Sequence, residues 1–197
     1  MSLAVLVSGT GSILDAMVSA GLPVALVVSD RPCSAIGMAV DHDVEAVVVH
    51  RDSYGDDFDR DAYTSRLTDL LVDRGVSLVA MAGFGTILGQ PIYDRFAGHI
   101  LNTHPALLPA FPGWHAVRDA LAHGVTVTGC TVHLATLEVD AGPILAQGTV
   151  EVRPDDDEAS LHERIKAVER RLYVDTIRSV LGGELPVPAG ASGGASA

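Results

Sequence analysis

The stretch "LAVLVSGTGSILDAMVSAGLPVALVVSD", residues 3–30, decides the fold class of this chain. An unbroken apolar run at 3–9 ends in glycine. Apolar residues then recur at helical spacing over 12–21, where Gly21 stops the pattern, and a second apolar run fills 24–30. This order is typical of a buried strand, a helix and a second buried strand. Such a unit places its two strands side by side and parallel in one sheet.

The alternation of strand-like and helix-like segments continues along the chain. Further strands are predicted at 45–50, 77–83 and 99–104, and helices at 34–42, 57–74, 90–98 and 115–123. The apolar face of helix 57–74 is predicted to carry Phe58, Ala62, Leu67, Leu70 and Leu71.

The C-terminal part has a different pattern. The β-rich runs 125–136 and 142–152 predict an antiparallel pair, and 158–181 predicts the last helix. We therefore expect an α/β fold with a mixed, mostly parallel sheet flanked by helices and a Rossmann-like N-terminal half. A single domain is expected over 1–181, followed by a disordered Gly/Ala/Ser/Pro-rich tail at 182–197.

Composition narrows the classes of partner. The chain has 197 residues and a formal net charge of -12, which argues against nucleic acid as a partner. No apolar run approaches the roughly 18 residues that would cross a bilayer. The run at 3–9 follows no basic segment, so it predicts a strand and not a signal peptide, and we expect a cytoplasmic protein without a membrane partner. Cys33 and Cys130 lack CxxC spacing and the histidines lack metal spacing, so we expect free thiols and no metal.

The first loop, "SGTGS", predicts an anion site. Gly9 and Gly11 lie between a strand and a helix, where exposed backbone N–H groups and the helix N-terminus favour a phosphate. A plain strand–helix turn is the simpler interpretation. A third alternative is a dinucleotide site, with Asp30 as the ribose-binding acid, although Leu14 occupies the position of the third glycine.

A second group of polar residues ends the predicted strand 99–104. Asn102 and His104 are two residues apart and therefore point to the same side, whereas Thr103 faces away. An amide can stabilise an oxyanion, and an imidazolium can donate a proton to it, so the pair suits a reaction that develops charge on a carbonyl oxygen. The alternative is that Asn102 caps the strand and His104 is a buried structural ring.

Two further polar residues, Asp140 and His133, lie in the C-terminal part of the chain. Asp140 lies in "TLEVDAGPI", a turn sequence at 136–144, and its carboxylate could reach a histidine elsewhere in the fold. The alternative is that Asp140 is simply a turn residue. His133, in an alternating strand, is interpreted as a packed or surface residue.

Five motifs resemble a known family when taken together. "VLVSGTGSIL", "MAGFGTIL", "ILNTHPALLPAFPG", "GCTVHLATLEVDAGPIL" and "AVERRLY" occur here in the order found in the phosphoribosylglycinamide formyltransferase family. The resemblance covers about residues 3–181. It implies the formyltransferase fold, 10-formyltetrahydrofolate as formyl donor, and the primary amine of glycinamide ribonucleotide as acceptor in purine synthesis. It implies small-molecule substrates only, and a monomer or homodimer.

The resemblance also implies roles for individual residues. The catalytic positions are Asn102, His104 and Asp140. The substrate phosphate would bind Thr10, Gly11, Ser12 and Ile13, with Pro105 and Glu169 as further substrate contacts. The folate would bind Phe84, Gly85, Thr86, Ile87, Leu88 and Val139, and Arg60 is a further expected ligand contact.

Several positions depart from the family pattern. Thr10 and Ile13 replace usual asparagines, Gly85–Thr86 replaces a common Met-Arg pair, and Ala106 replaces a usual serine. Because the catalytic positions are intact, these departures bear on substrate contacts and not on the chemistry. The alternatives are a formyltetrahydrofolate deformylase, a formyltransferase acting on another amine, and a non-catalytic binding relative.

Overall fold

The computed structural model describes residues 1–185 and is built on one seven-stranded sheet. The strand order is β3-β2-β1-β4-β5-β6-β7. Five strands are parallel, namely β1 (Leu3–Val7), β2 (Val24–Ser29), β3 (Glu45–Val48), β4 (Leu78–Met81) and β5 (Ile100–His104). Two antiparallel strands, β6 (Val127–Leu134) and β7 (Ile144–Glu151), complete the sheet. The predicted mixed, mostly parallel α/β fold is confirmed.

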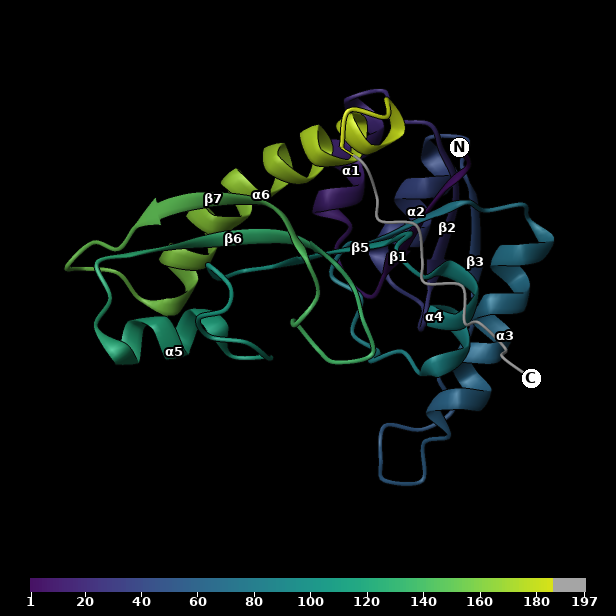
Figure 1. Cartoon of the computed structure of the whole chain (residues 1–197), viewed down its shortest axis with the longest axis horizontal. Helices are drawn as coiled ribbons and strands as arrows, with labels where there is room; N and C mark the ends of the chain where they lie inside the picture. Colours follow the sequence, from purple (N-terminus) through teal and green to yellow (C-terminus); the bar gives the residue numbers. More distant parts are fainter. Residues whose placement is uncertain (186–197) are drawn as a thin grey trace, which may run out of the picture.

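Helices cover both faces of the parallel strands (Figure 1). On one face α1 (Ser12–Ser19), α2 (Ser34–Asp41) and the long α6 (Glu158–Leu181) contribute to the core, and on the other α3 (Arg60–Asp73) and α4 (Gln90–Phe96) do so. The side chains of successive β1 residues therefore pack on opposite faces of the sheet: Leu3 and Val5 on one face, and Ala4 on the other. Burial on both faces explains why the sequence of β1 is continuously apolar.

The strand order places a switch point at β1. The chain moves outward from β1 to β2 and β3, then returns to β4 on the opposite side of β1. The loops that follow β1 and β4 therefore diverge at their carboxyl ends and leave a crevice, which is where open α/β sheets bind ligands.

The β6–β7 hairpin extends away from the parallel strands. In Figure 1 α6 runs along it, with α5 (Ala116–His123) beside its outer part. A small apolar cluster containing Val117, Cys130 and Ile165 joins α5, β6 and α6. A register shift between Val132 and His133 interrupts the pairing of β6 with β7, and irregularities of this kind re-aim neighbouring side chains.

The third helix differs from its prediction. It begins at Arg60 and not at 57, because the Asp59 side chain accepts a hydrogen bond from the Ala62 N–H and caps the first turn. Phe58 lies before the helix, and Ala62 is exposed because it lies off the buried face of α3. The buried face carries Tyr63, Thr64 and Thr68 besides the predicted Leu67 and Leu71, whereas the predicted Leu70 is half-buried. Each threonine hydroxyl donates to the carbonyl four residues earlier, which satisfies it inside the core.

Both cysteines are free thiols. Burial raises the pKa of the Cys130 thiol to about 12, whereas Cys33 is half-buried. Within residues 1–185 no helix combines the length and apolar character needed to cross a membrane. Most of the expected tail, residues 186–197, lies outside the described residues.

Candidate active site

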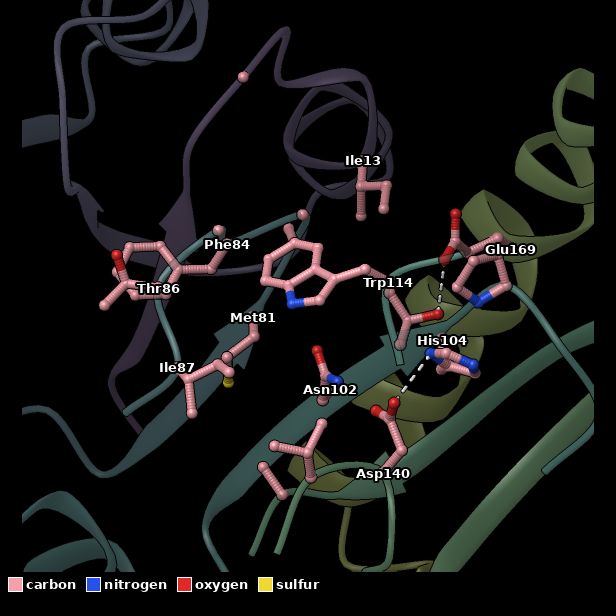
Figure 2. A pocket seen from close by; sticks show the side chains of 18 of the residues that line it. Ile13, Met81, Phe84, Thr86, Ile87, Asn102, His104, Trp114, Asp140 and Glu169 are labelled. Atoms are coloured by element: carbon pink, nitrogen blue, oxygen red, sulfur yellow. Dashed lines mark hydrogen bonds and ion pairs between the residues drawn. The ribbon is translucent and has the colours of Figure 1, made fainter. Parts of the chain in front are cut away.

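A pocket of about 560 Å³ opens at the carboxyl ends of the central strands (Figure 2). It is bounded by the loops after β1 and β4, the end of β5, the β6–β7 loop and α6. The predicted residues that line it are Thr10, Gly11, Ser12, Ile13, Phe84, Gly85, Thr86, Ile87, Leu88, Asn102, His104, Pro105, Val139, Asp140 and Glu169. Arg60, the first residue of α3, lies outside this lining.

The end of β5 and the β6–β7 loop bring an imidazole and a carboxylate together. His104 Nδ1 lies 3.3 Å from Asp140 Oδ2, and each side chain is only 6% exposed. On the other side of the ring, His104 Nε2 hydrogen-bonds the Phe111 carbonyl at 2.8 Å. Since both ring nitrogens face acceptors, the arrangement accommodates the doubly protonated imidazolium.

The Asp140 backbone adopts an unusual conformation. Its φ is 57°, in the left-handed region that non-glycine residues seldom occupy. In this conformation Oδ2 also accepts a hydrogen bond of 2.8 Å from the Gly113 N–H. Asp140 therefore connects the histidine of β5 to the loop that follows β5.

His133 belongs to this group, although the sequence indicated only a packed or surface residue. It is 1% exposed and pairs across the sheet with Asn102. Its Nδ1 hydrogen-bonds the Leu134 carbonyl at 3.0 Å, so Nε2 is left to accept from Asn102 Nδ2 at 3.2 Å. Burial lowers the pKa of His133, which favours this neutral form. His133 thereby orients the amide of Asn102.

The other side of β5 carries a second polar contact. Thr103 faces away from Asn102 and His104, as predicted, and its hydroxyl donates to Glu169 Oε1 at 2.8 Å. Both residues nevertheless line the pocket, which reaches around the end of the strand. Burial raises the pKa of the Glu169 carboxyl, while the Thr103 hydrogen bond opposes this by stabilising the ionised form.

Two further lining residues of α6 were missed. His162 and Lys166, the single lysine of the chain, precede Glu169 by seven and three residues. This spacing places all three on one face of a helix. That spacing was visible in the sequence, but nothing local showed that this face borders the pocket.

The β1–α1 loop depends on one glycine. Gly11 has φ +80° and immediately precedes α1, and a Cβ there would lie 2.8 Å from Ala35 Cβ. No side chain caps the start of α1, so the first backbone N–H groups of the helix are available to an anion in the pocket. Ile13 lines the pocket next to this loop, but its side chain supplies no hydrogen-bond donor.

Asp30 does not form a ribose site. It is fully buried, binds Arg31 through two hydrogen bonds of 2.9 Å, and accepts a third of 2.7 Å from the Thr86 hydroxyl. Its carboxylate oxygens are thus occupied by hydrogen bonds within the protein, which argues against a ribose contact and so against the dinucleotide alternative. A Cβ at Gly85 would lie 3.1 Å from the Arg31 guanidinium. The Gly85–Thr86 pair is therefore adapted to the Asp30–Arg31 ion pair.

The remaining wall of the pocket is largely apolar. Phe84 and Leu88 are buried, whereas Ile87, Val139 and Trp114 stand exposed at the rim. Trp114 was not predicted; nothing local in the sequence indicates that the loop after β5 turns back to the pocket. Across residues 1–185 no group of three or more His, Cys, Asp or Glu side chains is arranged to hold a metal ion.

Comparisons with known proteins agree with this geometry. A family model described as "Formyl transferase" matches residues 1–177. The phosphoribosylglycinamide formyltransferase of Mycobacterium tuberculosis is 47% identical over 183 residues, covering 90% of this chain and 84% of that protein. The protein of that name from Bacillus subtilis is 33% identical, covering 91% of this chain and 94% of the relative.

Solved structures show the same architecture. The crystal structure of glycinamide ribonucleotide transformylase 1 from Symbiobacterium toebii superposes with a TM-score of 0.89 at 39% identity, covering 96% of this chain and 91% of that one. The transformylase 1 of Geobacillus kaustophilus superposes with a TM-score of 0.83 at 36% identity, covering 92% and 98% of the two chains. The match over nearly the whole chain, in sequence and in fold, shows that this protein belongs to the formyl transferase family.

Proposed function

We propose that this protein transfers the formyl group of 10-formyltetrahydrofolate to the primary amine of glycinamide ribonucleotide in purine biosynthesis. The observation that carries the proposal is the meeting of Asn102, His104 and Asp140 in a pocket that has the uncapped start of α1 at one side and an apolar wall at the other. Relatives that carry the name of this activity match the chain over nine-tenths of its length.

The proposed reaction begins when the amine nitrogen attacks the formyl carbon. One N–H of the Asn102 amide donates to His133, and the second, which has no partner among residues 1–185, would stabilise the oxyanion that forms. His104 Nε2, which hydrogen-bonds the Phe111 carbonyl in this structure, would donate to the same oxyanion instead. Asp140 stabilises the imidazolium and, through water, helps move the amine proton to the departing folate nitrogen.

The ribonucleotide is proposed to span the polar side of the pocket. Its phosphate would bind the N–H groups around Gly11 and Ser12, and Lys166 would add positive charge. Glu169, held by Thr103, would accept hydrogen bonds from the sugar or the amine. Thr10, Ile13 and Pro105 complete this proposed surface.

The folate is proposed to occupy the apolar side. Phe84, Ile87, Leu88 and Val139 would contact its ring system, and the backbone of Gly85 and Thr86 would border it. Arg60 lies outside the lining, so a contact from it would have to reach the distal end of the donor. Independence from metal, a cytoplasmic location, and a monomeric or homodimeric state stay predictions.

The proposal is tested by following absorbance during deformylation of 10-formyltetrahydrofolate, with and without glycinamide ribonucleotide. Release that depends on the ribonucleotide supports the transferase, and His104→Ala should then abolish it. His42→Ala, a half-exposed histidine outside the pocket, is the matched control. Release at an equal rate without ribonucleotide would identify a deformylase, and no release in either case would contradict both enzymes.

A further inference from the structure

Trp114 is an exposed aromatic side chain at the edge of the pocket. It is the single tryptophan of the chain and is 70% exposed, although it lines the pocket. It lies on the loop between β5 and α5. Figure 2 draws its indole reaching over the pocket, between Ile13 and Asn102 and toward Phe84. Holding so large an apolar group in water forgoes the free energy of burying it.

Two other exposed apolar side chains line the same pocket. Ile87, on the loop after β4, is 39% exposed, and Val139, on the β6–β7 loop, is 48% exposed. Three separate loops therefore each direct an apolar side chain to one opening. An exposed apolar surface assembled in this way is typical of a ligand site. An apolar ligand in this pocket would reduce the exposure of these side chains.

The loop that carries Trp114 is joined to the catalytic groups. Gly113, its neighbour, donates to Asp140 Oδ2 at 2.8 Å, and the Phe111 carbonyl binds His104 Nε2 at 2.8 Å. Phe111 is in turn anchored on α5 by the His123 ring, with centroids 5.6 Å apart. The backbone on the N-terminal side of Trp114 is therefore tied to Asp140, a catalytic group, through the Gly113 N–H.

The chemistry of the site calls for exclusion of water. Attack by the amine forms a C–N bond at the formyl carbon, breaks the bond from that carbon to the folate nitrogen, and moves one proton from the amine to that nitrogen. Attack by water forms a C–O bond instead and releases formate and tetrahydrofolate. An amide, an imidazole and a carboxylate assist either nucleophile, so these three groups do not by themselves select the amine.

We propose that Trp114 covers the flat aromatic part of the formyl donor and shields the formyl carbon from water, so that transfer to the amine prevails over hydrolysis. This inference rests on the proposed function and adds a specificity-determining residue to it. Ile87 and Val139 supply further apolar contacts from the same lining, and the Gly113–Asp140 hydrogen bond holds the loop that carries Trp114.

The first test uses Trp114 as its own reporter. Because it is the single tryptophan, the intrinsic fluorescence excited at the indole band reports this site alone. Acrylamide should quench it efficiently in the free protein. A stable folate analogue should shift the emission to shorter wavelength and lower the quenching constant by about threefold or more, as the indole leaves water. Free tryptophan mixed with the analogue corrects for absorption by the ligand.

The second test measures how the formyl group partitions. Trp114→Ala should raise the KM for the donor and the ratio of formate to formylated product by about tenfold each, the loss expected for one aromatic contact. Trp114→Phe retains a ring and should restore most of the wild-type ratio. Val127→Ala, an exposed apolar residue outside the pocket, is the control and should leave both values unchanged.

The outcomes separate this inference from the proposed function. A wild-type protein that transfers the formyl group, but whose indole keeps the same quenching constant with the analogue bound, would overturn the role of Trp114. So would a Trp114→Ala protein with an unchanged partition ratio. A wild-type protein without ribonucleotide-dependent transfer would contradict the proposed function itself.

Discussion

At the scale of single residues, the site is organised by Asp140. Its carboxylate contacts His104, accepts from the Gly113 N–H, and lies 3.7 Å from His133 Nε2. One side chain therefore supports the imidazole and also holds the loop that follows β5. Its left-handed backbone conformation, at φ 57°, keeps the carboxylate in that position.

Asp140→Asn should separate the charge from the hydrogen bond. The amide oxygen can still accept from Gly113, so the loop is retained, but the charge that stabilises the imidazolium is lost. We expect kcat to fall by about a hundredfold to a thousandfold, with little change in the KM for the donor. Steady-state kinetics with both substrates measures this, and Asp69→Asn on the exposed side of α3 is the control. Equal losses in kcat and in donor binding would contradict the assigned role.

Replacing the buried Glu169 should stabilise the fold but weaken binding of the ribonucleotide. Burial raises the pKa of its carboxyl above the ordinary 4.5, so ionisation costs the folded state more than the unfolded state as the pH rises past 4.5. Glu169→Gln keeps the acceptor for Thr103 and removes this cost. We expect the Tm at pH 7 to rise by about 2–4 °C, while the KM for the ribonucleotide increases.

The pH dependence supplies the check on this prediction. Below pH 4.5 the wild-type carboxyl is protonated in both states, so the difference in Tm between the two proteins should shrink as the pH falls toward that value. Calorimetric scans at several pH values measure it. A difference in Tm that does not change with pH would show that the charge is not its cause.

At the scale of elements, the β1–α1 connection joins a buried strand to a helix through a glycine with positive φ. Gly9 and Gly11 look equivalent in the sequence, but their surroundings differ. A Cβ on Gly11 would meet Ala35 at 2.8 Å, whereas one on Gly9 would meet nothing within 4 Å. The close approach of α2 to this loop therefore makes only Gly11 structurally required.

Gly11→Ala and Gly9→Ala form a matched pair of variants. Gly11→Ala should cost about 1–3 kcal/mol of stability, because it adds both backbone strain and a clash. It should also raise the KM for the ribonucleotide by about tenfold, since it displaces the N–H groups that would bind phosphate. Gly9→Ala should alter stability by no more than about 0.5 kcal/mol. Urea unfolding of both proteins gives the comparison, and equal stability losses would contradict the structural assignment.

At the scale of the whole molecule, α6 connects the hairpin half to the parallel half. Its capped start is packed near β6 and β7, with Asp157 and Ser160 forming a reciprocal capping box. Farther along, the buried Tyr173 hydroxyl reaches the Met81 carbonyl at 3.1 Å and the Leu101 carbonyl at 2.9 Å. Glu169 lies one turn before this tyrosine, so the site depends on how α6 is seated against β4 and β5.

Two buried tyrosines test this seating. Tyr173→Phe removes a hydroxyl that binds two strand carbonyls and should lower the free energy of unfolding by about 1–2 kcal/mol. It should also raise the KM for the ribonucleotide, because Glu169 loses support. Tyr63→Phe removes a buried hydroxyl that has no hydrogen-bond partner within residues 1–185, so it should be neutral or stabilising. Urea unfolding measures both, and a larger loss for Tyr63→Phe would contradict this account.

Much of the architecture followed from local pattern. Apolar runs of strand length, amphipathic segments and Gly punctuation located the strands and helices, and the βαβ order predicted the parallel sheet. The glycine-containing β1–α1 loop and the i, i+2 pair Asn102 and His104 could also be located from the sequence, because strand alternation and loop chemistry act between near neighbours. The prediction was wrong at Ala62, because the face of α3 that packs on the sheet runs through Tyr63 and Leu67.

The composition of the pocket was decided by tertiary structure. His133 faces Asn102 because of the antiparallel register of β5 and β6, Lys166 borders the pocket because of how α6 is seated, and Trp114 reaches the rim because its loop is held by Asp140. These contacts join residues that are far apart along the chain. The sequence by itself determined which segments become strands and helices, since backbone geometry and burial act over a few residues. Only packing between whole elements decided which side chains meet across the pocket, because that energy depends on positions that no local pattern specifies.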